Sequence, residues 1–198
     1  MPVFPGTESP SLVVPCTIEK DGFQETEIRM WSHVGTHMDA PAHIIAGGAT
    51  LDSFGVESFG GAAVVVDIGA LHKDEIGVSD LLAYEELLIE SDFLLLRSGW
   101  SKSWGQEDYF HGYPVLSGEA ARWLATLDLK GIGIDMISID ADESRDLPVH
   151  NILLGNNVLV IENLTNLEEL PASGFTFYTL PLKFKDVDGS PVRAIAVI

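Results

Sequence analysis

Basic residues are scarce in this 198-residue sequence, and so are cysteines and long hydrophobic runs. Lysine and arginine total 11 against 30 aspartates and glutamates, which gives a formal net charge of −19. A negative field of this size repels nucleic-acid phosphates and anionic lipid surfaces, and no apolar stretch approaches the ~20 residues that span a bilayer. We therefore expect neither nucleic acid nor a membrane as a partner. The absence of a basic, signal-like start makes the cytoplasm the expected compartment.

Cysteine occurs once, at Cys16. A single cysteine excludes an intramolecular disulfide and a cysteine-rich zinc module. Any metal ion must therefore be bound by histidines and carboxylates. With 46% apolar and 21% charged residues the chain lies within the range of globular proteins, and we expect residues 1–198 to form one domain.

Several short apolar, β-branched runs are bounded by Gly, Asp or Ser, as buried strands are. These predicted buried strands are Leu12–Ile18, Ala62–Ile68, Phe93–Arg97, Gly131–Asp135 and Val158–Ile161. A further segment, Glu27–Ser32, alternates more and predicts a half-exposed strand. The stretch from Gly174 to Ile198 carries no convincing long helix, so extra β layers are expected there.

Helical spacing of apolar residues is confined to two segments, Ser79–Glu90 and Ser117–Leu127. The first residue of each is a serine, which we expect to serve as the N-cap. Strands and helices alternate between residues 62 and 135, and this order predicts a βαβαβ core with some parallel pairing. The sequence therefore predicts a mixed α/β domain rich in β structure.

The clearest functional signal is a cluster of histidines. Three of the six histidines fall within eleven residues of the segment SHVGTHMDAPAHI. Gly35 opposes a helix in this segment, so an irregular strand is favoured, in which His37 and Asp39 project to the same side. Gly35 also allows the backbone to bend and bring His33 round to them. Two imidazoles and a carboxylate suit zinc, manganese or iron; the alternative is an exposed loop that happens to contain three histidines.

A second candidate site lies downstream. His150 stands just before a predicted strand, and Glu162 stands at the far end of that strand. A carboxylate buried there requires a cation, a metal or hydrogen-bond donors. Taken alone, a glutamate such as Glu162 is more often a structural ion-pair partner than a metal ligand.

The unbroken run His-x-Gly-Thr-His-x-Asp-Ala-Pro-x-His, from His33 to His43, resembles the signature of the metal-dependent cyclase and bacterial kynurenine formamidase family. Three downstream segments resemble that family in the same order: RSGW at 97–100, GIDMISID at 133–140 and HNILLGNNVLVIENLTNL at 150–167. The resemblance covers essentially the whole chain. It implies a swivelling β/β/α fold and a mononuclear or dinuclear metal centre.

The resemblance also implies one or two Zn²⁺ ions per subunit, with Mn²⁺ as the alternative. The implied ligands are His33, His37 and Asp39 for one ion, and Asp39, His150 and Glu162 for the second. Asp39 would bridge the two ions. The position that matches His43 is the catalytic acid or base of the family, although spacing alone equally allows His43 to be a further ligand.

Three functions follow as hypotheses. The first is hydrolysis of a small amide by a metal-activated water, with N-formylkynurenine or a related N-formyl aryl amine as substrate and a place in tryptophan catabolism. His43 would move the proton, and Glu162 is the second candidate for that role. Another hypothesis is a cyclase or an isatin-hydrolase-like enzyme acting on a cyclic amide or lactone. The third is a metal-stabilised binding protein without turnover.

Partners other than a small-molecule substrate are expected to be further copies of the chain. The resemblance, together with apolar residues scattered through the first 30 positions, favours a homodimer or a homotetramer. Aromatic side chains near the expected site suggest an aryl substrate. These aromatic residues are Trp31, Trp100, Trp104, Tyr109 and Phe110.

Overall fold

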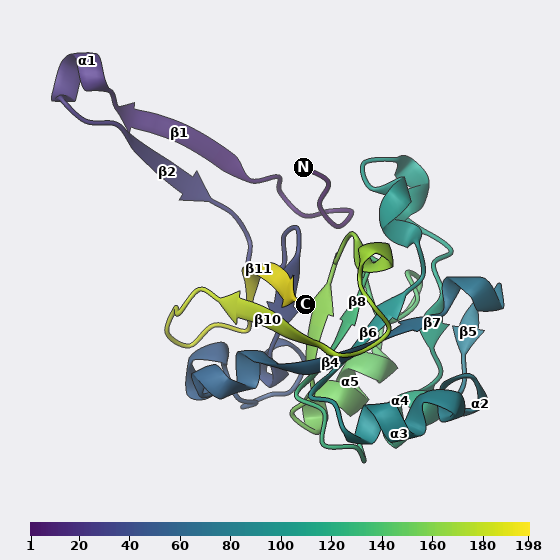
Figure 1. The fold of residues 1–198 in the computed structure, drawn as a ribbon. Coiled ribbons are helices and arrows are strands. Elements are labelled where there is room, and N and C mark those ends of the chain that lie inside the picture. The colour runs from purple at the N-terminus through teal and green to yellow at the C-terminus, as the bar shows by residue number, and fades with distance from the viewer.

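Seven strands close into a barrel in the computed structural model, which describes residues 1–198 (Figure 1). Their order around the barrel is β10 (Phe175–Pro181), β11 (Gly189–Val197), β3 (His37–Asp39), β9 (Leu159–Glu162), β8 (Gly131–Ile134), β6 (Phe93–Arg97) and β4 (Gly60–Asp67). A two-stranded sheet of β5 (Glu75–Ile76) and β7 (Val115–Leu116) lies beside them. No helix combines the length and the apolar character needed to cross a bilayer.

The parallel half of the barrel confirms the expected βαβαβ core. Strands β4, β6, β8 and β9 pair in parallel in that order. Each is an almost continuous apolar run because both of its faces are buried. The antiparallel half is made by β10, β11 and β3, and it supplies the extra β layers expected near the C-terminus. The mixed α/β prediction is therefore confirmed.

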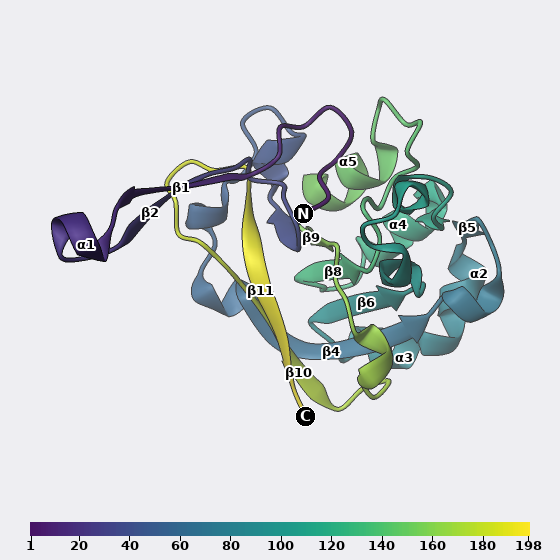
Figure 2. The ribbon, with the colours of Figure 1, turned by 90° about the horizontal axis from the view of Figure 1, so that it is seen from above.

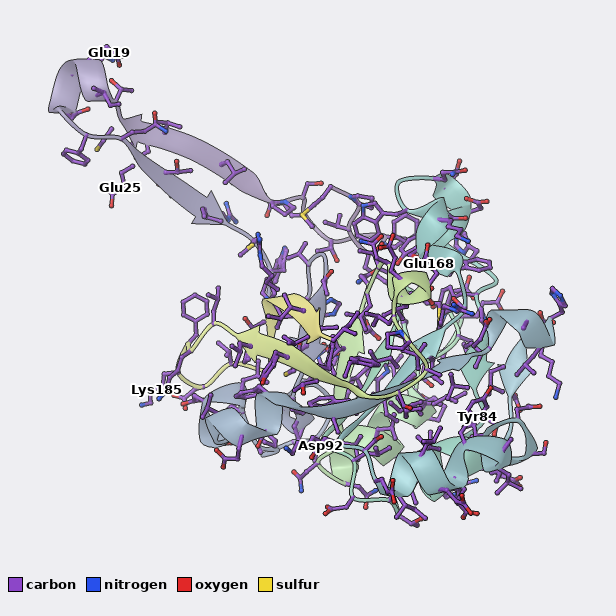
Figure 3. All side chains as sticks on the ribbon, in the orientation of Figure 1. Glu19, Glu25, Tyr84, Asp92, Glu168 and Lys185 are labelled. Carbon is purple, nitrogen blue, oxygen red and sulfur yellow. The ribbon has the colours of Figure 1, made fainter.

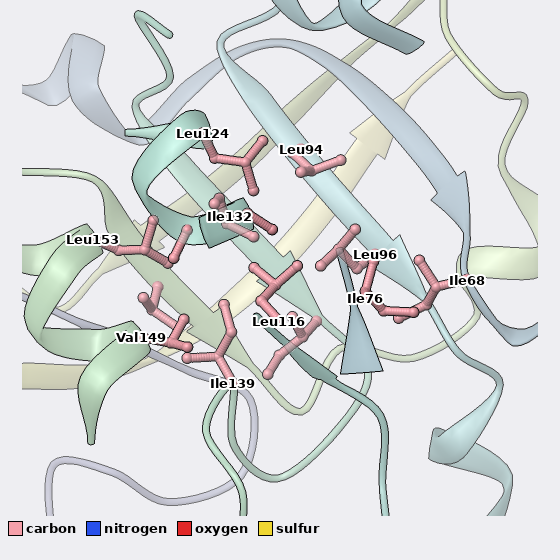
Figure 4. Close-up of a cluster of buried hydrophobic side chains, with 14 of the residues drawn as sticks. Ile68, Ile76, Leu94, Leu96, Leu116, Leu124, Ile132, Ile139, Val149 and Leu153 are labelled. Atoms are coloured by element: carbon pink, nitrogen blue, oxygen red, sulfur yellow. The ribbon is translucent and has the colours of Figure 1, made fainter. Parts of the chain in front are cut away.

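Successive residues of these strands point to opposite faces and pack into two separate hydrophobic clusters. Val64 and Val66 of β4 belong to a cluster of 25 buried residues. Leu124 and Leu153, which come from helices, belong to the same cluster (Figure 4). Val65, the residue between Val64 and Val66, belongs instead to a second cluster of 14 buried residues that includes Met38, Phe93 and Phe177. This alternation follows from the two-residue period of a strand. The barrel is thus filled by side chains and holds β3 rigidly.

The second predicted helix is confirmed, and the first is corrected. Helix α4 (Gly118–Leu124) begins after Ser117, whose hydroxyl accepts a hydrogen bond from the Ala120 N–H at 3.0 Å. The segment predicted as one helix from 79 to 90 is instead broken by a 3₁₀ turn into α2 (Val78–Leu81) and α3 (Glu85–Ile89). Gly77, and not Ser79, occupies the N-cap of α2.

Helix α5 (Pro148–Gly155) contains His150 and was not predicted from the sequence, which placed His150 only before a strand. Pro148 occupies the first turn, where a proline's missing N–H costs nothing. The N–H groups of Val149 and His150 donate to the two carboxylate oxygens of Asp140, each at 2.9 Å. This cap comes from a residue eight positions before the helix, which explains why local pattern did not reveal it.

A hairpin arm projects from the body of the molecule (Figures 1 and 2). It consists of β1 (Ser11–Cys16), the short α1 (Ile18–Asp21) at its tip and β2 (Glu25–Arg29). No residue of these three elements is buried. The prediction of a buried strand over Leu12–Ile18 is therefore wrong, and so is the extension of the second strand to Ser32. The apolar composition correctly indicated a strand at this position, but no other segment of the chain packs over that strand.

Candidate metal centre

Neighbouring strands place the central ligands together. His37 and Asp39 lie on β3, and His37 stands opposite Glu162 in the antiparallel pairing of β3 with β9. His150 reaches the same point from α5. These four residues are buried, with exposures of 5% or less. The structure therefore brings both predicted halves of the site into one place.

His33 joins the cluster from the loop before β3. Gly35 has φ +64°, a left-handed conformation that favours glycine, and this bend returns the chain toward Asp39 as expected. The Nδ1 atom of His33 lies 2.6 Å from Asp39 Oδ1. Its Nε2 atom lies 2.9 Å from Oδ2 of Asp188, a residue that precedes β11. Asp188 was not predicted, because a single aspartate before a glycine is the ordinary composition of a turn.

Spacing between the donor atoms fits a divalent cation. His37 Nε2 lies 3.4 Å from a carboxylate oxygen of Asp39 and 3.4 Å from one of Glu162. His150 Nε2 lies 3.5 Å and 3.3 Å from the other oxygens of the same two carboxylates. Tetrahedral ligands about 2.0–2.1 Å from a zinc ion stand roughly 3.3 Å apart. The four side chains are thus arranged as ligands of a common centre.

The clearest sign of such an ion is Asp39 itself. It belongs to two clusters of potential ligands, one with His33 and His37 and one with His150 and Glu162. Its Oδ2 atom is fully buried and accepts no hydrogen bond. An unpartnered buried carboxylate oxygen is costly, and a metal ion would satisfy it. The bridging position implied for Asp39 is consistent with this geometry.

His43 reaches the same site from a 3₁₀ turn (Pro41–His43). Its ring stacks on that of His33 with centroids 4.0 Å apart, and its Nδ1 lies 3.6 Å from Asp188 Oδ2. His43 belongs to a third cluster of potential ligands, with His33 and Asp188, but it shares no cluster with Asp39 or Glu162. His43 is therefore linked to the buried carboxylates only through His33.

Charges within the site are strongly coupled. Burial opposes a charge on His33, but hydrogen bonds and the charges of Asp39 and Asp188 outweigh it and raise the pKa of His33 to about 9. Burial also disfavours ionised carboxylates, yet the surrounding imidazoles hold the pKa of Asp39 well below its ordinary value and that of Glu162 below its own. Burial lowers the pKa of His43. The pKa values of His37 and His150 are raised in turn, so both carboxylates stay anionic beside protonated imidazoles, whose protons a bound ion would displace.

The remaining ring nitrogen of each buried histidine is fixed by a hydrogen bond. His37 Nδ1 donates to the Gly35 carbonyl at 2.8 Å, and the same oxygen accepts from Asn163 Nδ2 at 3.0 Å. Tyr109 in turn donates to Asn163 Oδ1 at 2.8 Å. These bonds leave Nε2 of His37 directed at the two carboxylates, the arrangement typical of metal-binding histidines.

Asp140 performs the same task for His150. Its Oδ2 atom accepts from His150 Nδ1 at 2.8 Å, so the ring is oriented by the carboxylate that also caps α5. Asp140 lies in the GIDMISID segment that resembles the family. Its role in orienting His150 becomes visible only from the contact between the two side chains in the structure.

A cavity of about 470 Å³ opens onto the cluster. Its apolar wall is made of Phe4, Trp31, Ile137 and Leu147. Of the aromatic residues expected near substrate, only Trp31 lines this cavity. Trp100 and Phe110 pack against the core instead, and Trp104 and Tyr109 line a second cavity.

Comparison with known sequences finds relatives that match most of the chain. A sequence profile of the family described as "Putative cyclase" matches residues 1–141. An uncharacterized protein of Methanocaldococcus jannaschii is 34% identical over 198 residues, which cover 98% of this chain and 94% of the relative. The kynurenine formamidase of Bacillus cytotoxicus is 31% identical over 194 residues, which cover 97% of this chain and 89% of that enzyme.

Solved structures share the fold. Isatin hydrolase A from Labrenzia aggregata, bound to benzyl benzoate, superposes with a TM-score of 0.83 at 26% identity and covers 99% of this chain and 87% of that one. An isatin hydrolase bound to the product analogue thioisatinate gives a TM-score of 0.85 at 26% identity, with 97% and 82% of the two chains covered.

Proposed function

This chain is a member of the cyclase family, and on that premise we propose that it hydrolyses a small amide with the help of a divalent metal ion. The single observation that carries the proposal is Asp39, which is buried, shared by two ligand clusters and left with an unpartnered oxygen. The residues that would hold the metal are His33, His37, Asp39, His150 and Glu162.

The ion is best assigned as Zn²⁺, one or two per chain, with Mn²⁺ as the alternative. Imidazole nitrogen and carboxylate oxygen are ligands that zinc accepts, and the donor spacings of 3.3–3.5 Å suit its bond lengths. When bound, such an ion polarises a substrate carbonyl and lowers the pKa of a water molecule to near neutrality.

His43 is the proposed catalytic acid and base. It lines the cavity, is half-buried and stands outside the ligand clusters of Asp39 and Glu162. From this position its ring would take a proton from the attacking water and deliver it to the nitrogen that leaves the carbonyl carbon. Such proton transfer contributes about 10²–10⁴ in rate. Glu162 is the alternative acid, but it contacts both His37 and His150, which favours a role as ligand.

The substrate is proposed to be an aryl amide. Trp31 and Phe4 give the cavity an aromatic wall, and the relatives include proteins named kynurenine formamidase and isatin hydrolase. An N-formyl aryl amine such as N-formylkynurenine is the first candidate. A cyclic amide of the isatin type, or a lactone, is the second, because it presents the same carbonyl chemistry and a planar ring.

A substrate panel tests this proposal. Protein purified, stripped with a chelator and reloaded with Zn²⁺ or Mn²⁺ is assayed against N-formyl aryl amines, isatin-like lactams, cyclic imides and lactones. We expect metal-dependent hydrolysis of at least one amide, and the substrate preference distinguishes the two candidates. If no substrate is turned over by the loaded protein, the function as a metal-stabilised binding protein takes first place.

A further inference from the structure

The third cluster of potential ligands, formed by His33, His43 and Asp188, has the geometry of a metal site of its own. Asp188 Oδ2 lies 2.9 Å from His33 Nε2 and 3.6 Å from His43 Nδ1. These distances bracket the roughly 3.3 Å that separates two ligands of a tetrahedral zinc ion. All three side chains line the cavity, so an ion from solvent can reach them.

The two ring nitrogens of His33 face different carboxylates. Nδ1 lies 2.6 Å from Asp39, and Nε2 lies 2.9 Å from Asp188. An ion bound at Nε2 takes the place of the proton between His33 and Asp188, which is released to solvent, while Nδ1 keeps its hydrogen bond to Asp39. The site of the first ion, called here the Asp39 centre, then retains the four buried ligands His37, Asp39, His150 and Glu162.

The fold holds Asp188 in position between the two histidines. Ser32 donates to Asp188 Oδ1 at 3.1 Å, and the Asp188 carbonyl accepts from the Ala40 N–H at 2.9 Å. Residue 189 is a glycine, and a Cβ at that position would lie 2.8 Å from His33 Nε2. The missing side chain therefore allows β11 to bring Asp188 against His33. The ion pairs of Asp188 are with His33 and His43 alone, so no lysine or arginine competes with a metal ion there.

The third cluster is more exposed than the Asp39 centre. The side chains of His33, His43 and Asp188 are 23%, 28% and 43% exposed, and the cluster contains a single carboxylate. Charge attraction is weaker near solvent than in the interior, and three protein ligands leave a fourth position for water. An ion is therefore expected to bind here only in an excess of free Zn²⁺, after the Asp39 centre is filled.

We propose that His33, His43 and Asp188 form a separate zinc site that inhibits the enzyme. When Nδ1 of His43 binds the ion, the ring carries its proton on Nε2 and has no nitrogen left to accept a proton from the attacking water. The ion thus removes the proposed acid and base while the Asp39 centre stays loaded. Binding of this ion is independent of the proposed function, whereas its effect on the rate rests on that function.

Calorimetric titration of Zn²⁺ into protein whose Asp39 centre is already loaded measures the site directly. We expect wild type to bind one further ion per chain. Asp188→Asn and His43→Gln each remove one ligand, and because even the loss of an orienting partner lowers metal affinity 10–100-fold, each should weaken this binding about tenfold or more. Circular dichroism of each variant shows that the fold is retained.

Asp186→Asn is the matched control. Asp186 lies in the same loop as Asp188, but its carboxylate is 73% exposed and pairs with Lys185 at 3.6 Å. Lys185 projects into solvent from the loop between β10 and β11 (Figure 3). Asparagine fits the left-handed backbone of residue 186, where φ is +58°. The control therefore removes the same charge from the same loop, and it should bind the further ion as wild type does.

The initial rate of amide hydrolysis at rising free Zn²⁺ measures the consequence. In wild type and Asp186→Asn we expect the rate to fall about 100-fold at saturation, because proton transfer contributes 10²–10⁴ in rate. In Asp188→Asn the rate, relative to its own maximum, should fall only at a Zn²⁺ concentration about tenfold higher or more. Dilution to low free Zn²⁺ should restore the rate.

Three results would overturn the proposal. They are no ion bound beyond those of the Asp39 centre, a further ion bound equally well by wild type and Asp188→Asn, and a further ion that leaves the rate on an active substrate unchanged. A protein that binds the further ion through Asp188 but hydrolyses no amide at any Zn²⁺ concentration would contradict the proposed function and still confirm the zinc site.

Discussion

At the scale of single residues, the site depends on how each ligand is held as much as on which ligand it is. The candidate ligands could be selected from the sequence because histidines and an aspartate at close spacing are typical of metal sites. The residues that orient them, Asp140, Asn163 and Asp188, were not predictable as such, because each contacts a histidine that lies 10 to 155 positions away in the sequence. An isolated aspartate gives no local signal of a bond to a distant imidazole.

Replacing Asp140 by Asn tests the orienting role. The substitution removes the charge that fixes the His150 ring, and we expect the affinity for Zn²⁺ to fall about 10–100-fold. Competition with a fluorescent chelator measures the affinity. Asp142→Asn is the matched control, because Asp142 also bonds a histidine, His111, but on the exposed surface. Equal losses in the two variants would contradict the assignment.

Substitutions of His43 and Asp39 separate proton transfer from metal binding. His43→Ala is expected to retain a metal content near normal and to lose about 10²–10⁴ in rate. Asp39→Ala should lose both metal and activity, since both ligand clusters include this residue. Elemental analysis and initial rates on the same samples check the prediction. If His43→Ala empties the site as Asp39→Ala does, His43 is a ligand and Glu162 becomes the proposed acid.

At the scale of elements, the parallel strands were predictable because strands buried on both faces read as continuous apolar runs. Strand β3, only three residues long, was predicted as an irregular strand, but its place in the barrel was not. It forms by pairing with β9 and β11, which lie more than 100 positions away in the sequence. Barrel closure was unpredictable for the same reason. The prediction of a buried strand over Leu12–Ile18 was wrong because no other part of the same chain covers the apolar residues of the arm.

Ser117 and Ser79 were both predicted to be helix N-caps, but only Ser117 caps a helix in the structure. Ser117→Ala is expected to lower the free energy of unfolding by about 1 kcal/mol, because the hydroxyl satisfies the Ala120 N–H. Ser79→Ala should change it by less than about 0.5 kcal/mol, since Ser79 lies inside α2 and does not cap it. Urea denaturation followed by circular dichroism measures both. A larger loss at Ser79 would contradict the structural assignment.

At the scale of the whole molecule, a bound metal ion would reduce the excess of negative charge that the chain carries. Asp39 and Glu162 are buried in a protein of net charge −19, and a divalent cation offsets this pair where no lysine or arginine contacts them. Ion binding and folding are therefore expected to be coupled, because a ligand that binds only the folded state stabilises it.

Chelation should accordingly destabilise the protein. At an ion concentration of about 100 Kd, binding adds about 2.7 kcal/mol of stability, so removal of the metal with a chelator should lower the melting temperature by several degrees. Asp39→Ala should melt at the same temperature with and without chelator, because both ligand clusters include Asp39. Differential scanning calorimetry checks this, and a wild type that is insensitive to chelator would argue against a bound ion.

The central claim is that ions held around Asp39 make this protein an amide hydrolase. The most direct measurement is the initial rate of hydrolysis of an N-formyl aryl amine during stepwise addition of Zn²⁺ to stripped protein, with bound metal determined in each sample. We predict that the rate rises with bound metal and reaches its plateau when one or two ions are bound per chain. A rate that is independent of bound metal, or no hydrolysis of any amide at full loading, would contradict the claim.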